Sequence, residues 1–194
     1  EYVAVLAFLA AIIGISGCSR QKEEKLTKYD TQFFELFDTV TSVTGYARDE
    51  KTFQSYVDVF YDELKEYHQL YDIYNDYEGI NNIKTINDHA GIEPVVVDDK
   101  IIQMLEEAVD IYELTDGNMN VAMGSVLSIW HEYREAGLKH PEQAQLPPQE
   151  ELEEAAKHMD IRKMVIDPEK KTVYLEDPDM SLDVGAIAKG YAAE

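Results

Sequence analysis

The sequence contains a single cysteine and few basic residues. Because Cys18 is the only cysteine among 194 residues, the chain cannot form an internal disulfide and has no cysteine cluster for zinc. Lysine and arginine number 17 against 39 aspartates and glutamates, which gives a formal charge of −22. This balance argues against a sequence-independent grip on nucleic acid and predicts repulsion from anionic lipid. We therefore expect no nucleic-acid partner.

The first apolar run is too short for a permanent transmembrane helix. Residues 2–15 carry no charge and have the length of the hydrophobic region of a secretory signal. The run ends in Ile15-Ser16-Gly17-Cys18, which resembles a bacterial lipobox, where the cysteine thiol takes the lipid. We therefore predict a partial lipoprotein signal peptide over 1–17 and a lipidated tether over 18–28. The alternative is an unmodified cysteine in an N-terminal hydrophobic anchor.

Acyl chains on Cys18 would hold the protein at the extracytoplasmic face of a bacterial cell membrane, since its negative charge would not attract it to anionic lipid.

Apolar residues make up 45% of the chain and tyrosines number 13, so a packed core is available. Residues 29–194 suffice for one domain, and no internal repeat is visible after the tether.

The periodicity of the chain predicts strands and helices in an α+β order. Alternating and β-branched residues predict strands over 33–37, 40–46 and 94–97, and a hairpin joining 163–167 to 172–176. Apolar residues three and four apart predict helices over 52–71, 100–114, 121–134 and 149–158. The segment 72–91 is rich in Asn, Asp and Gly and predicts turns. We expect His68 at the surface or its boundary, and Trp130 in the core.

The end of the chain has the composition of a phosphate site. Residues 181–184 predict a strand end, Gly185 a turn, and 186–194 a helix of small residues. Free N–H groups at a helix start attract anions, and Lys189 adds a positive charge. Asp183 could accept from a donor or face a cation. The alternative interpretation is a tight strand-to-helix crossing that needs Gly and Ala for close approach.

Two blocks resemble the FAD:protein FMN transferase (ApbE) family. Asp183-Val-Gly-Ala-Ile-Ala-Lys-Gly-Tyr-Ala192 is similar to the family signature of Asp, then Gly-Gly/Ala-Ile-Ala-Lys-Gly-Tyr/Phe-Ala. The segment from Thr115 to Trp130 is similar to the family's Thr-x-Gly-x-Phe/Met-Asp/Asn-x-x-x-Gly-x-Leu-x-x-Trp block, and the two blocks stand in the family's order. The resemblance implies a mixed sheet with packed helices.

The resemblance also implies a set of site residues. Family positions that contact FAD match Phe37, Tyr74, Asn118, Met119, Asn120, Asp183 and Lys189. Ala186 matches a position whose backbone carbonyl binds the metal. Phe37-Asp38-Thr39 stands where relatives carry Met-Gly-Thr, and Asn120 where they often carry Asp. Asn87 lies near an asparagine of the family pattern.

The reaction implied by the resemblance is the transfer of FMN from FAD to a threonine or serine hydroxyl of an acceptor flavoprotein, with release of AMP. Mg²⁺ would neutralise the diphosphate. The expected acceptor is a flavin-carrying protein of membrane electron transfer. Two alternatives stay open: a pyrophosphatase that hydrolyses FAD to FMN and AMP, and a non-catalytic lipoprotein that binds flavin.

The family extends far beyond the motif at which this sequence stops. The resemblance therefore implies an ApbE-like fold truncated at its C-terminus, with the catalytic base and the remaining metal ligands in the missing part. We expect this stretch alone to be weakly folded or inactive.

Overall fold

The computed structural model describes residues 25–194 and has an α+β fold with small sheets, as predicted. Its elements in chain order are β1 (Thr27–Phe33), β2 (Thr41–Ala47), α2 (Glu50–Tyr71), α3 (Ile83–Asp88), β3 (Val95–Val96), α4 (Asp99–Leu114), η1 (Val121–Met123), α5 (Gly124–Lys139), η2 (Pro141–Gln143), α6 (Gln149–Ala155), η3 (Ala156–His158), η4 (Ile161–Lys163), β4 (Met164–Asp167), β5 (Thr172–Leu175) and α7 (Ala188–Tyr191). The predicted signal peptide and Cys18 lie outside the described residues.

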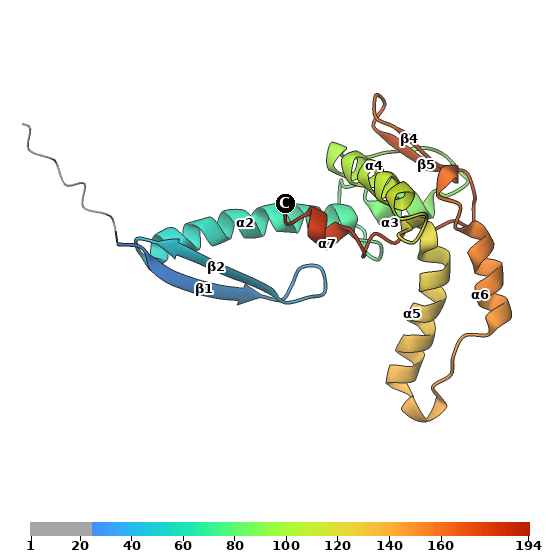
Figure 1. Cartoon of the computed structure of the whole chain (residues 1–194), viewed down its shortest axis with the longest axis horizontal. Coiled ribbons are helices and arrows are strands. Elements are labelled where there is room, and N and C mark those ends of the chain that lie inside the picture. The colour runs from blue at the N-terminus through green and yellow to red at the C-terminus, as the bar shows by residue number, and fades with distance from the viewer. Residues whose placement is uncertain (1–24) are drawn as a thin grey trace, which may run out of the picture.

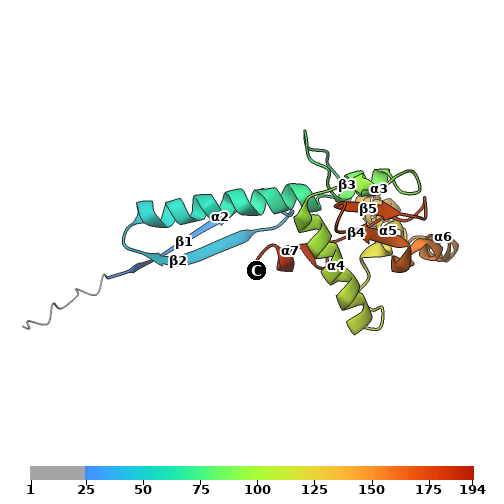
Figure 2. The same cartoon turned by 90° about the horizontal axis from the view of Figure 1, so that it is seen from above.

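Two arms extend from a central body (Figure 1). The first arm is the β1–β2 ribbon with α2 lying along it, and the second is the pair α5 and α6 (Figures 1 and 2). The body contains α3, α4 and the sheet β3-β5-β4, and the pairings in both sheets are antiparallel. Among residues 25–194, no helix combines the length and hydropathy needed to cross a bilayer.

The first strand differs from the prediction. β1 pairs with β2 from Thr27 opposite Ala47 to Phe33 opposite Thr41, so residues 34–40 form the connecting loop and not the expected strand over 33–37. The loop breaks the strand because Phe37 and Asp38 adopt left-handed backbone conformations, with φ of 56° and 49°. Thr27 and Lys28, which the sequence places in the tether, belong to β1.

The long helices follow the predicted periodicity. The side chain of Asp49 caps α2, whose buried face includes Phe53, Val57 and Leu64 against the ribbon. Asp98 caps α4 in the same way, and α4 contributes the central part of the main core. The predicted hairpin is confirmed as β4 and β5.

The segment 72–91 contains a helix that the prediction of turns missed. α3 has six residues and is too short to show a helical period, but Asn82 and Thr85 form a reciprocal capping box at its start. Its Ile83 and Ile86 are buried in the main core.

The end of the chain also departs from expectation. Residues 181–184 form no strand but run extended through the body, and the predicted helix over 186–194 is reduced to the four residues of α7. α7 packs beside the end of α2, where the rings of Tyr191 and Tyr71 lie 6.4 Å apart. α5 runs five residues past its predicted end, to Lys139, and Trp130 is 43% exposed on it and not in the core.

Candidate functional site

Four of the predicted FAD-binding residues line one pocket. Phe37, Tyr74, Asp183 and Lys189 surround a cavity of about 470 Å³ where the loop 34–40, the end of α2 and the start of α7 meet. Arg134 of α5 also lines it, so the pocket is built from four segments that are far apart in the sequence. Four residues of the set implied by the resemblance therefore meet in one cavity, and their contact with FAD stays a prediction.

A second pocket opens beside the first. It measures about 580 Å³ and lies along α5 and the chain after it, with the mostly apolar lining of Leu127, Trp130, Tyr133, Leu138, Leu146 and Pro147. Tyr74, Arg134 and Asp183 line both pockets, so the two cavities adjoin at these three side chains. A polar pocket next to an apolar one suits a ligand that has both a charged part and a flat ring.

The backbone before Asp183 is fixed from two sides. The side-chain amide of Asn87 donates to the Leu182 carbonyl at 3.0 Å, and the Leu182 N–H donates to Asn87 Oδ1 at 2.7 Å. The Asp183 N–H donates to the Val121 carbonyl at 2.8 Å. The Gly185 N–H then donates to Asp183 Oδ1 at 2.9 Å, which closes a tight turn. These bonds hold the carboxylate of Asp183 at the junction of the pockets.

Tyr74 is placed by a turn at Asp72. Asp72 Oδ1 accepts from the N–H groups of Tyr74 at 2.7 Å and Asn75 at 3.1 Å. Burial opposes ionisation of Asp72, but these bonds and those from the side chains of Asn75 and Tyr77 lower its pKa. The ring of Tyr74 lies 5.4 Å from that of His131 on α5. Burial and the nearby charge of Asp183 raise the pKa of the Tyr74 hydroxyl.

His68 anchors the loop that carries Phe37. The Phe37 N–H donates to His68 Nδ1 at 3.2 Å, and the two rings meet edge to face at 5.5 Å. The other ring nitrogen lies 3.4 Å from the Tyr77 hydroxyl, which donates to Asp72 Oδ2 at 2.7 Å. His68 is a boundary residue, as expected, but it also lines the pocket, and only its tertiary partners reveal this.

The block at 118–120 does not line either pocket. The Asn118 amide donates to the Thr115 carbonyl at 2.7 Å, and the Met119 N–H donates to Thr115 Oγ1 at 3.1 Å. Asn120 caps η1 and donates to the Met159 carbonyl at 2.9 Å. Contact of these three residues with FAD stays a prediction.

The charge of the first pocket suits a cation-assisted diphosphate site. Its lining includes the carboxylates of Glu35, Asp38, Asp72 and Asp183 and the cations of Arg134 and Lys189. A bare diphosphate would meet more negative than positive charge there, and a bound divalent cation would balance it. Ala186 lies exposed in the turn that follows Asp183 and leads into α7, but it does not line the pocket. Binding of a metal by its backbone carbonyl stays a prediction.

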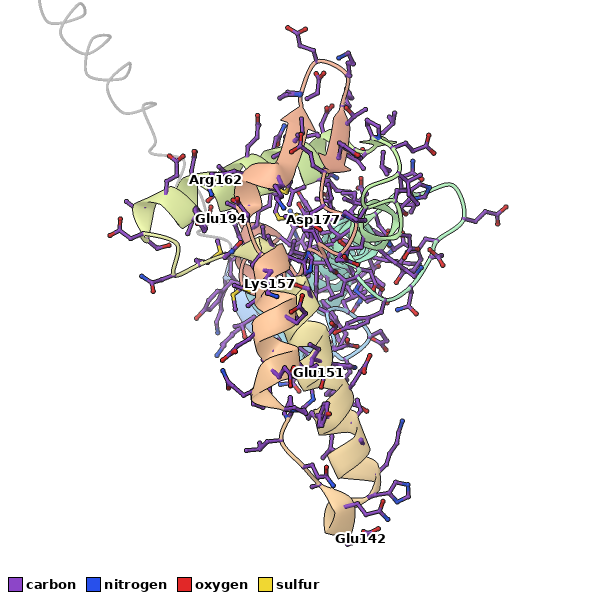
Figure 3. All side chains as sticks on the ribbon, turned by 90° about the vertical axis from the view of Figure 1, so that its right-hand side faces the viewer. Glu142, Glu151, Lys157, Arg162, Asp177 and Glu194 are labelled. Carbon is purple, nitrogen blue, oxygen red and sulfur yellow. The ribbon has the colours of Figure 1, made fainter. Side chains whose placement is uncertain are left out.

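A second group of ionisable side chains lies away from these pockets. Asp177 is buried, and its carboxylate pairs with His158 Nδ1 at 2.9 Å and with Lys163 Nζ at 2.8 Å. The bond from Lys163 lowers the pKa of Asp177 to about 2, with His158 contributing less. Figure 3 shows Asp177 in the body and Glu142 at the far tip of the α5–α6 arm. We interpret the group as a structural ion-pair network.

Comparison with known proteins matches the expected family. A sequence profile of the ApbE family matches residues 37–194. The chain is 21% identical to a protein of Chlamydia pneumoniae over 94% of the chain and 53% of that protein, and 25% identical to one of Vibrio cholerae over 97% and 52%. Both relatives are named FAD:protein FMN transferase.

Solved structures give the same result. The crystal structure of the ApbE protein of Thermotoga maritima superposes with a TM-score of 0.69 at 25% identity, covering 86% of this chain and 50% of that one. The chain thus spans about half the length of the relatives it matches. The profile match over 37–194, the shared α+β fold and the pocket formed around Asp183 together show that this chain belongs to the ApbE family.

Proposed function

We propose that this chain binds FAD as part of an FAD:protein FMN transferase, which moves FMN to a threonine or serine hydroxyl of an acceptor flavoprotein and releases AMP. The observation that carries the proposal is the pocket in which Phe37, Tyr74, Asp183 and Lys189 converge, in a chain of this family. Phosphoryl transfer asks a protein mainly for positioning and charge neutralisation, and these residues can provide both.

Each pocket residue has a definable role. Lys189 attracts the diphosphate, and Tyr74 offers an exposed ring on which a flat ligand can stack. Asp183 is held in place to orient a donor or a cation. When bound, Mg²⁺ would offset the charge of the diphosphate, with Asp183 and the Ala186 carbonyl as its ligands from this chain. Attack of the acceptor hydroxyl on the FMN phosphorus forms the new ester as the bond to AMP breaks.

Cys18 supplies the proposed anchor. Lipid on its thiol would keep the enzyme at the extracytoplasmic face of the membrane, close to acceptors of membrane electron transfer. Metabolic labelling with a radiolabelled fatty acid tests this, because Cys18→Ser should abolish the label and move the protein into the soluble fraction. Equal labelling of both proteins would disprove the anchor.

Activity is tested with the protein expressed from its intact open reading frame. We expect incubation with FAD, Mg²⁺ and a threonine-bearing acceptor to release AMP and to make the acceptor heavier by one FMN. EDTA should stop both. AMP release without a heavier acceptor would support the pyrophosphatase instead, and FAD binding without turnover would support a flavin-binding lipoprotein. Double substitution of Asp183 and Lys189 by alanine should abolish FAD binding.

A further inference from the structure

Arg134 stands at the junction of the two pockets and was not among the residues that the sequence indicated. Its side chain extends from α5 and lines both cavities, together with Tyr74 and Asp183. Lys189 reaches the first pocket from α7, on a different segment. Arg134 and Lys189 are the cationic side chains in the lining of that pocket. Four carboxylates line the same pocket, so these two cations are the charged side chains there that could bind a phosphate group directly.

The guanidinium of Arg134 is oriented by a neighbour. Nη2 lies 2.8 Å from His131 Nδ1, and because arginine can only donate, the imidazole nitrogen accepts. The ring of His131 in turn lies against that of Tyr74, at 5.4 Å and a tilt of 33°. A carboxylate oxygen of Glu135 is 3.7 Å from Nη2, too far for a hydrogen bond. Since a guanidinium has five N–H donors, the bond to His131 orients the group and leaves donors for a ligand.

The charge of Arg134 acts on Tyr74, which lines the same pockets. Burial raises the pKa of the Tyr74 hydroxyl, the charge of Asp183 adds to the rise, and the charge of Arg134 opposes it. Because Arg134 and Tyr74 line the same two pockets, Arg134 lies where it could compensate the charge of a ligand stacked on Tyr74. A planar guanidinium matches phosphate oxygens with two parallel hydrogen bonds, which the ammonium of a lysine cannot do.

We propose that Arg134 binds the diphosphate of FAD from α5 while Lys189 binds it from α7. The two residues would then form a two-cation clamp at the junction of the pockets. This inference rests on the proposed function, because FAD is the ligand that brings a diphosphate to this place. It adds a specificity determinant: ligands with a diphosphate should depend on Arg134, and a flavin without phosphate should not.

Binding of FAD, ADP and riboflavin to the protein from its intact open reading frame tests the clamp by calorimetry in the presence of Mg²⁺. Arg134→Gln should weaken the binding of FAD and ADP by about ten- to a hundred-fold, which is the size of a lost charge-assisted contact. It should leave the affinity for riboflavin unchanged. Arg134→Lys should lose less, because it keeps the charge but not the planar fork. The salt dependence of FAD binding should be smaller in Arg134→Gln than in the wild type.

Arg162→Gln is the matched control. Arg162 lies in η4, is also exposed and is salt-bridged to Asp160, the residue before η4, and it lines neither pocket. The Arg162→Gln variant should bind FAD, ADP and riboflavin with the affinities of the wild type. Equal FAD affinity in Arg134→Gln and wild type would overturn the clamp while leaving the proposed function in place. A parallel loss of riboflavin would also overturn it, since Arg134 would then shape the pocket. Failure of the wild type to bind FAD or ADP would overturn both.

Discussion

Removing the side chain of Asn87 should loosen the turn that presents Asp183. Asn87 makes two hydrogen bonds to the backbone of Leu182, from a position 95 residues earlier in the chain. Leu182 is fully buried at 0% exposure, so water cannot replace these bonds without opening the body. In Asn87→Ala, the N–H and C=O groups of Leu182 lose their partners together.

The expected cost follows from that burial. Each lost hydrogen bond removes about 0.5–1.5 kcal/mol, and an unsatisfied buried group costs about 1–3 kcal/mol, so we expect a loss of about 2–4 kcal/mol in the free energy of unfolding. The same change should weaken FAD binding, because Asp183 follows the freed residue directly.

Urea denaturation followed by circular dichroism measures the first effect, and calorimetric titration with FAD the second. Asn81→Ala is the matched control, because the exposed amide of Asn81 makes one bond, to the Val96 carbonyl at 2.8 Å. It should cost less than about 1 kcal/mol. If Asn87→Ala were no more destabilising than Asn81→Ala, the inference that Asn87 fixes the backbone at Leu182 would be wrong.

Asn87→Asp sharpens the test. The carboxylate can still accept from the Leu182 N–H, but its second oxygen would face the Leu182 carbonyl, and two acceptors repel. The variant should therefore be at least as unstable as Asn87→Ala at pH 7. Its stability should rise relative to that of Asn87→Ala as the pH falls toward 4, because the protonated acid can donate a hydrogen bond to the Leu182 carbonyl. An unchanged difference across that range would contradict the geometry.

Three further predictions concern packing, pH and stacking. Gly124→Ala should destabilise by about 1–3 kcal/mol, because a Cβ there would lie 2.5 Å from a backbone oxygen, whereas Gly190→Ala, with open space, should not. Asp177→Asn should cost about 2 kcal/mol at pH 7 but little at pH 2: its folded pKa of about 2 lies below the usual 3.8, so its contribution is present above pH 3.8 and lost as the pH falls through 2. Tyr74→Phe should keep FAD affinity, and Tyr74→Ala should lose about tenfold.

Each has a decisive measurement. Thermal melts of the two glycine variants should separate, and coincident melts would contradict the contact with residue 181. Urea midpoints of the wild type and Asp177→Asn should converge between pH 4 and pH 2, and parallel curves would contradict the ion-pair network. Fluorescence titration with FAD should rank Tyr74→Phe above Tyr74→Ala, and equal values would argue against stacking.

The sequence by itself determined the local elements and the family. The caps and periodicity of α2 and α4 and the turn between β4 and β5 are encoded within a few residues, so they could be predicted. The motif from Asp183 to Ala192 indicated the family because it is contiguous. α3 was missed because six residues cannot show a helical period.

Only the tertiary structure decided how the site is assembled. Asn87 bonds to Leu182, His68 accepts from the Phe37 N–H, and Arg134 lines the same pocket as Asp183, across segments that share no local pattern. Such contacts depend on how α2, α5 and the extended end of the chain pack around one core, and that packing is a property of the whole chain. The prediction of a strand before Asp183 was wrong for the same reason. The side chain of Asn87 and the backbone of Val121 hold that segment extended, and no strand among residues 25–194 pairs with it.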